Sequence, residues 1–298
     1  MKRRKNYLIF ITPAFILYTI FVVFPVIYVI YLSFTDWSGL GAVHFVGLKN
    51  FGTIFTDPRF APEFRNAIKN NLKYLLCVWF VITPFQYFVA YMFFIKIPAY
   101  KYIKFMVFFP YVISSTIVSF FAMLVFDPNI GFLNHILGSL GMSKGAWFGD
   151  PHWAFMLLVL IIIWQSSGSG IMIFYSNFIS TSKEVMDASR VDVCNEWQRF
   201  RYIMFPMSLP SCASIISMST IWALAIFDYP FILGGAKGGI SGKLDFANIV
   251  FYRYTFGSAL NARSDLGFGA SICVVMFIVM FVITYVQSRI LRRFEYDT

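Results

Sequence analysis

Residues 181–210 read TSKEVMDASRVDVCNEWQRFRYIMFPMSLP, a charged and polar segment between two long apolar runs. Apolar residues make up 59% of the 298-residue chain and charged residues 13%, about half the charged share of a soluble protein. The net charge of +10 comes from basic residues that flank the apolar runs, which argues against a nucleic-acid partner. The composition therefore predicts an all-α membrane protein with this segment outside the bilayer.

Outward from this segment, six apolar runs are each long enough to cross a bilayer as an α-helix, which takes about 20 residues. They lack the two-residue alternation of a transmembrane β-barrel, so they predict a helical bundle. The runs cover residues 7–35, 74–95, 105–126, 154–178, 205–227 and 266–287. Residues 1–6, MKRRKN, resemble the start of a signal peptide, but the run that follows is too long and lacks a cleavage site. We expect an uncleaved first span.

Basic residues gather before the first run, between the second and third, between the fourth and fifth, and after the sixth. The opposite connections are longer and hold fewer basic residues for their length. The positive-inside rule therefore places both termini and the 181–210 segment in the cytoplasm. The sequence predicts a basic cytoplasmic N-terminus (1–6), one membrane domain (7–290) with a cytoplasmic loop (181–205), and a cytoplasmic tail (291–298).

The cytoplasmic loop carries signals for two short helices. Thr181 and Glu184 fit a capping box, and Asn195 with Gln198 fits a second one. We expect helices over about 182–192 and 196–205, ending where Pro206 admits the fifth span, with Glu196 and Arg199 paired at i,i+3. Such a loop is either a solvated amphipathic connector on the membrane surface or a docking element for a partner.

The same loop resembles the EAA motif of permease subunits of ATP-binding-cassette importers, above all the maltose-transporter-like carbohydrate permeases. That motif runs roughly E-A-A-x-x-D-G-A and continues into a helix with F, I and P at set places. The candidate coupling residues are Glu184, Asp187, Ala188, Ser189, Asp192, Val193, Cys194, Trp197, Phe200, Ile203 and Pro206. Segments 126–134, 147–154, 227–235 and 265–270 also sit where similar segments occur in that family, so the resemblance covers most of the chain.

The resemblance implies an importer-permease (MetI-like) bundle of six transmembrane helices in a bacterial cytoplasmic membrane. It implies that the loop docks in a groove on an ATPase subunit, where Asp192 fixes the turn and Ala188 allows close approach. The implied partners are a second homologous permease subunit, two ATPase subunits, an extracytoplasmic solute-binding protein and membrane lipid. ATP and magnesium would be bound by the ATPases, so no cofactor is expected in this chain.

The chain departs from the family motif in the loop. Asp187 stands for Glu, Ser189 for the second Ala, and Val193 with Cys194 for Gly-Ala. Glycine suits a turn with positive φ, which a β-branched valine resists. Either the turn avoids that conformation or Asn195 adopts it.

Catalytic and metal-binding patterns are missing from the sequence. GGAKGGISGK at 234–243 fails as a P-loop, because Lys237 stands where the first glycine belongs and Leu244 follows the final lysine; we expect a flexible loop. The histidines are isolated, and the four cysteines fit packing positions better than disulfides or metal ligands. We therefore expect a transport subunit that is not an enzyme, holds no metal and takes its energy from partners.

Polar residues within spans tend to face the bundle interior, although helix packing alone also explains single serines and threonines. The candidates for a substrate path are Ser115, Thr116, Gln165, Ser219, Trp222, Asp228 and Tyr229. Asp228, at the outer end of the fifth run, equally fits a helix cap or a contact with the binding protein. None of the runs has a central ionisable residue, which disfavours an ion-coupled carrier and favours an uncharged, hydroxyl-rich substrate. The alternatives are an importer for a non-sugar solute and a membrane scaffold that moves nothing.

Overall fold

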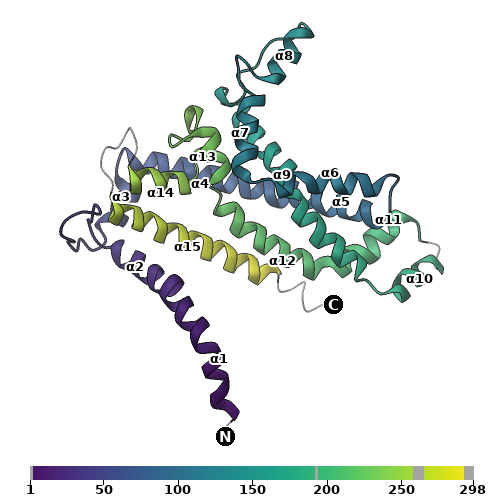
Figure 1. Cartoon of the computed structure of the whole chain (residues 1–298), viewed down its shortest axis with the longest axis horizontal. Helices are drawn as coiled ribbons and strands as arrows, with labels where there is room; N and C mark the ends of the chain where they lie inside the picture. The colour runs from purple at the N-terminus through teal and green to yellow at the C-terminus, as the bar shows by residue number, and fades with distance from the viewer. Residues whose placement is uncertain (1–2, 192–193, 258–264, 292–298) are drawn as a thin grey trace. The chain divides into compact units, whose positions relative to one another are not determined.

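The computed structural model describes residues 3–191, 194–257 and 265–291 of the chain (Figure 1). These residues form α-helices with short π and 3-10 segments, and the pairing of Thr35 with Phe45 is an isolated bridge. Five of the described helices are long and apolar enough to cross a membrane, or six if one bent pair counts as a span. The five are Phe10–Leu32, Phe60–Phe94, Ala154–Ile179, Glu196–Gly234 and Leu266–Leu291. The predicted all-α membrane class is confirmed.

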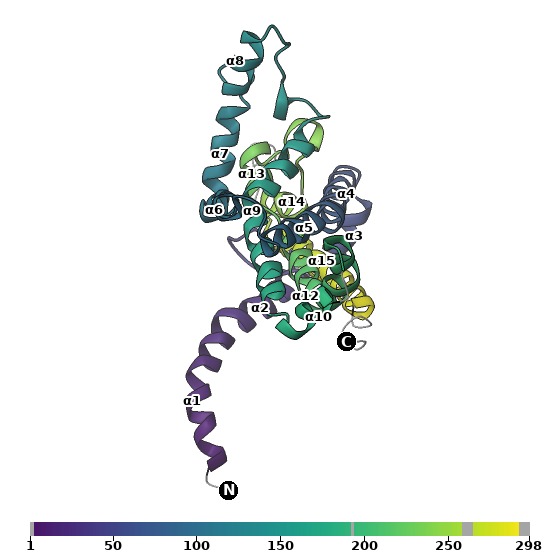
Figure 2. The same ribbon diagram turned by 90° about the vertical axis from the view of Figure 1, so that its right-hand side faces the viewer.

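The third apolar run is not the straight span that the sequence predicts. α6 (Tyr100–Val112) and α7 (Ser115–Val125) meet at an angle of 100°. Ile113 and Ser114 are extended, and the Ser114 hydroxyl accepts a hydrogen bond from the Ile117 amide at 3.3 Å, so it caps a new helix. Figure 2 shows α6 end-on with α7 turning away from it. The hydropathy of this apolar run does not reveal that Ser114 caps a new helix within it.

Three helices contain a π-helical turn that ends two residues before a proline. The turns are Thr19–Val23, Val78–Ile82 and Phe200–Met204, which precede Pro25, Pro84 and Pro206. Proline lacks an N–H and crowds the carbonyl four residues earlier, and a wider turn lets the helix continue past it. The helix therefore does not end at Pro206 as predicted. α11 (Glu196–Arg199), the π turn and α12 (Phe205–Leu224) follow one another without a break.

The chain divides into two compact units, which we describe separately. The first comprises Met1–Phe64 and Val250–Val279. Its helices, whole or in part, are α1 (Arg3–Tyr18), α2 (Phe24–Leu32), α3 (Lys49–Thr56), the start of α4 (Phe60–Cys77), α14 (Ala247–Phe256) and the start of α15 (Leu266–Leu291). The Phe60 ring packs edge-on against Tyr254 and Phe268 at 4.7 and 4.8 Å. The buried Arg253 guanidinium pairs with Glu63 at 2.8 Å, which joins α14 to the start of α4.

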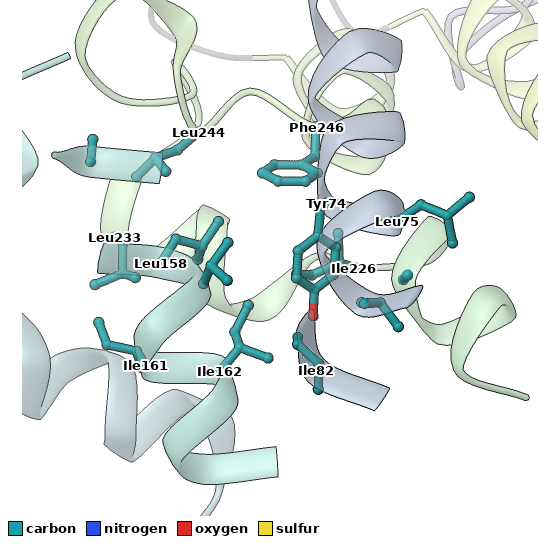
Figure 3. Close-up of a cluster of buried hydrophobic side chains, with 14 of the residues drawn as sticks. Tyr74, Leu75, Ile82, Leu158, Ile161, Ile162, Ile226, Leu233, Leu244 and Phe246 are labelled. Atoms are coloured by element: carbon teal, nitrogen blue, oxygen red, sulfur yellow. The ribbon is translucent and has the colours of Figure 1, made fainter. Parts of the chain in front are cut away.

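The second unit comprises Arg65–Ile249 and Met280–Thr298. Its remaining helices are α5 (Thr83–Phe94), α8 (Phe132–Ser139), α9 (Ala154–Ile179), α10 (Lys183–Val191) and α13 (Asp228–Gly234). α5 and α6 both pack along α9. Figure 3 shows one core cluster, in which Tyr74 of α4 and Leu158 of α9 pack with other apolar side chains, including that of Phe246. Whether residues 7–290 fold as one domain stays a prediction.

The glycine-rich segment at 234–243 is pinned by side-chain hydrogen bonds, contrary to the expectation of a flexible loop. The Asn66 and Asn70 amides of α4 donate to the Gly242 carbonyl at 2.8 and 2.9 Å, and Asn70 also donates to the Asp245 carbonyl. Gly238 and Gly242 have φ of 72° and 63°, which a β-carbon would disfavour. The glycines therefore allow a tight backbone turn, which hydrogen bonds from the Asn66 and Asn70 side chains hold in place.

Candidate functional site

Most of the charged loop forms what we name the docking element, the described residues within 183–204: α10, α11 and the π turn after it. The Asn195 capping box is confirmed. The Asn195 side-chain oxygen accepts a hydrogen bond from the Gln198 backbone amide at 2.8 Å, and the Asn195 backbone amide donates to Gln198 Oε1 at 2.9 Å. The first predicted box is wrong by one residue. The Ser182 hydroxyl, not Thr181, accepts from the Val185 amide at 3.4 Å.

The turn between α10 and α11 is described only in part, because Asp192 and Val193 lie outside the described residues. Asn195 has φ −70° and ψ 167°, so it does not take the positive φ that the family glycine suggests. The Cys194 amide donates to the Ser189 carbonyl at 3.2 Å, which closes the end of α10. The roles predicted for Asp192 and Val193 stay predictions.

The docking element has an exposed side and a packed side. Val191 and Trp197 are 80% and 67% exposed, and Glu184, Asp187 and Ala188 are exposed with them. Met204 is buried, and Met186 and Phe200 pack against a core cluster of α5 and α9. Ile203, Pro206 and Cys194 are partly buried. The element therefore combines an exposed side that carries apolar residues with a side that is packed on the bundle.

On the packed side, polar groups join the docking element to α5. The Tyr91 hydroxyl donates to the Glu196 carbonyl at 3.1 Å and approaches Glu196 Oε2 at 3.3 Å. The predicted Glu196 and Arg199 pair is confirmed at 2.5 Å. Arg199 Nε donates to the Ser189 hydroxyl at 3.1 Å. In Figure 1, α11 lies beside the C-terminal end of α5. Sequence reasoning missed Tyr91, although a tyrosine inside an apolar run requires a partner for its hydroxyl.

A second polar site, which we name the polar node, forms where α6 breaks into α7. The Ser115 hydroxyl donates to Asp228 Oδ2 at 2.9 Å, and the Tyr229 hydroxyl donates to Gln165 Oε1. Gln165 in turn donates to the Ile113 carbonyl at 2.7 Å. The helix break frees this carbonyl from an intrahelical partner, and Gln165, 6% exposed, satisfies it. α7, α9 and α13 are thereby joined through four of the seven predicted path residues.

The other three predicted path residues do not join the polar node. Thr116 is exposed. The Ser219 hydroxyl donates to the Ile215 and Ile216 carbonyls of its own helix at 2.8 and 3.1 Å, as a packing serine does. Trp222 is exposed and is not among the hydrogen-bonded residues at the node. A polar residue in a span therefore indicates the interior of the helix bundle only where a neighbouring helix provides it with a hydrogen-bond partner.

The polar node presents hydroxyl and carboxylate groups at a partly accessible position, and its carboxamide, that of Gln165, is buried. Asp228 is exposed, and Ser115 and Tyr229 are partly buried. These groups are both donors and acceptors, as recognition of a hydroxyl-rich ligand requires. Among the described residues, no group of three or more His, Cys, Asp or Glu side chains is placed to hold a metal ion. The four cysteines are free and half-buried.

Between α7 and α9 lies an excursion, residues 127–153, that is ordered by local hydrogen bonds. The buried Asn134 carboxamide bonds to the Pro128 and Gly145 carbonyls, to the Gly145 amide and to the Trp147 indole at 2.8 to 3.0 Å. The amides of Ile130 and Asn129 bond to the Asp127 carboxylate and hold its pKa below its usual value.

Comparison with known proteins identifies relatives along most of the chain. Residues 82–295 match the family model described as binding-protein-dependent transport system inner membrane component. The chain is 30% identical over 278 residues to the alpha-glucoside transport system permease protein AglF of Rhizobium meliloti, covering 91% of this chain and 78% of that protein. It is 28% identical over 294 residues to the probable starch degradation products transport system permease protein AmyD of Thermoanaerobacterium thermosulfurigenes, covering 98% and 95%.

The fold also matches a solved structure. One chain of a bacterial alginate ABC transporter, crystallised with an alginate pentasaccharide-bound periplasmic protein, superposes with a TM-score of 0.82 at 20% identity. The match covers 98% of this chain and 96% of that chain. At this identity the likeness establishes the fold alone.

Proposed function

Because this chain belongs to the binding-protein-dependent transport system inner membrane component family, we propose that it forms half of the translocation path of an ATP-driven sugar or oligosaccharide importer. As a family member it is a multi-pass inner-membrane transport component. Its relatives AglF and AmyD are named for the transport of alpha-glucosides and starch degradation products. The proposed substrate is an uncharged saccharide delivered by an extracytoplasmic binding protein.

The observation that carries the proposal is the docking element, which is exposed on one side and continuous with a span on the other. A partner bound to Trp197 would act on a helix, α11, that runs without a break into α12. We propose that the partners are two ATPase subunits, and that their closure rocks this chain against a second, homologous permease subunit. The distribution of basic residues supports a cytoplasmic position for the element and both termini.

The polar node is the proposed contact with substrate. It lies at a broken helix, where backbone carbonyls are freed for side chains or ligands, as in other transporters with discontinuous helices. Its Ser115, Asp228 and Tyr229 groups suit sugar hydroxyls, and the carboxylate of Asp228 disfavours an anionic ligand.

Reconstitution tests the proposal. The tagged chain is purified from its native membrane, the co-purifying subunits are identified, and the complex is placed in vesicles with the cognate binding protein. We expect two ATPase subunits per complex, and uptake of a labelled neutral oligosaccharide that requires both ATP and the binding protein. A complex without ATPases supports a scaffold, and a binding protein that retains only a charged non-sugar solute supports a different importer.

A further inference from the structure

The docking element contacts the rest of its unit by a second route besides the continuous helix into α12. Ser189 of α10, Arg199 and Glu196 of α11, and Tyr91 of α5 are joined by consecutive hydrogen bonds of 3.1, 2.5 and 3.1 Å. Ser189 is 2% exposed and the Arg199 side chain 11%, so the bond between them is largely shielded from water, whereas the Glu196 side chain is 56% exposed and its bond to Arg199 faces solvent. Shielded bonds to a charged group are stronger and more directional than exposed ones.

The first member of this set stands where the chain departs from its family motif. In the EAA motif that this loop resembles, a second alanine stands where this chain has Ser189, and alanine has no group that accepts a hydrogen bond from Arg199. The serine hydroxyl also donates to the Met186 carbonyl at 2.7 Å, which leaves its lone pairs for the guanidinium. In this chain, the end of α10 is therefore tied to α11 by a side chain.

The last member leads into a packed aromatic cluster. The Tyr91 ring contacts Phe200 at 4.8 Å and Phe178 of α9 at 5.9 Å between centroids, both edge-on. α9 then continues from Phe178 to Gln165 of the polar node, about 20 Å along the helix axis at 1.5 Å per residue. Packed aromatic side chains and a single helix thus connect the docking element to the node without passing through α12.

We propose that Ser189, Arg199, Glu196 and Tyr91 form a positioning relay that transmits displacement of the docking element to α5 and α9. The proposal rests on the proposed function, because the relay transmits motion only if a partner displaces the docking element. In this arrangement, α12 and the α5 and α9 pair move together when the element is displaced. Breaking the relay lets the ATPases turn over while α9, and with it Gln165, fails to follow.

A double-mutant cycle tests the relay in the reconstituted complex. Ser189→Ala restores the family residue and removes the hydroxyl, and Tyr91→Phe removes the other terminal hydroxyl while keeping the ring. Each is measured for saccharide imported per ATP hydrolysed. We expect each single variant to lower this ratio about three- to tenfold, the range set by one lost hydrogen bond, with ATP hydrolysis retained. The double variant is expected to import no less saccharide per ATP than the more impaired single variant, because both substitutions break the same path.

Matched controls separate the relay from general damage. Ser180→Ala removes an exposed hydroxyl that donates to the Asn177 carbonyl of the preceding helix, and Tyr102→Phe removes an exposed phenol hydroxyl. Both should leave the ratio at the wild-type value. An unchanged ratio in the relay variants, an equal loss of import and hydrolysis, or additive effects in the double variant would overturn the relay. A wild-type complex that lacks ATPases overturns the proposed function instead.

Discussion

The docking element and the polar node are assembled in opposite ways. The caps and ion pair of the docking element join residues three positions apart, such as Asn195 with Gln198 and Glu196 with Arg199. The node joins Ser115 to Asp228 across 113 positions and Gln165 to Tyr229 across 64. Local hydrogen-bonding preferences shape the first site, whereas only the packing of α7, α9 and α13 creates the second.

The two sites also differ in what they present to a partner. The docking element presents apolar area with charges beside it, which suits a protein groove. The node presents a few convergent polar groups, which suits a small hydroxylated ligand. Variants of the first should therefore change coupling to ATP hydrolysis, and variants of the second should change substrate affinity.

The largest expected effect comes from blocking the docking side. Ala188 is exposed, so Ala188→Trp should leave folding and membrane insertion intact while preventing close approach of a partner. We expect import to fall more than tenfold, the scale of a lost interface hot spot, and ATPase subunits to be lost during purification. Ala14→Trp, on an exposed face of the first span, is the control. Normal uptake and a normal subunit ratio in Ala188→Trp would remove the docking role from this face.

A second variant tests the node without touching the docking element. Gln165→Leu leaves the Tyr229 hydroxyl and the Ile113 carbonyl without their partner, at a cost of about 1 kcal/mol for each of these partly buried groups. We expect a lower Tm and a raised KM for the saccharide, with ATPase subunits still bound. Ser219→Ala, which removes a hydroxyl bonded to its own helix, should change neither value. Loss of ATPase binding in Gln165→Leu would mean that the two sites are not separable.

A smaller effect is expected from removing a local cap. Asn195→Ala deletes the capping box and should destabilise the start of α11 by about 1 kcal/mol. Amide hydrogen exchange over residues 196–200 should quicken about fivefold, while exchange around Tyr229 stays as in the wild type. Ser182→Ala should have a weaker effect, because its 3.4 Å bond is at the limit of hydrogen bonding. Faster exchange at the node would show that the cap acts beyond its own helix.

The smallest effect concerns pH and the excursion at 127–153. The pKa of Asp127 is lowered in the folded protein, first by the Ile130 amide and then by the Asn129 amide. The ionised carboxylate therefore stabilises the fold above its unfolded pKa of about 3.9, and this contribution is lost as pH falls through the lower folded value. Protection of the Asn129 and Ile130 amides should decline below pH 4, after correction for intrinsic exchange. Asp127→Asn should abolish this pH dependence, and its persistence would assign it to another group.

Much of the fold was predictable because it depends on local patterns. The apolar run at 154–178 appears as Ala154–Ile179, and the basic clusters and the Asn195 box follow short-range rules. The break between α6 and α7 was not predictable, since Ser114 and Pro110 lie in an apolar run that hydropathy reads as continuous. The continuation through Pro206 was also missed, because a π turn absorbs the proline that ordinarily ends a helix.

The sequence by itself determined the class, most of the spans and the position of the docking element, because hydropathy and capping act over one or two helical turns. Only the tertiary structure decided which polar residues meet. It selected Ser115, Gln165, Asp228 and Tyr229 from a longer set, and it supplied Tyr91 and the Ile113 carbonyl as partners. The physical reason is that a polar group inside the fold needs a hydrogen-bond partner within about 3 Å. Tertiary packing decides which distant residue comes that close, and the order of residues along the chain does not show it.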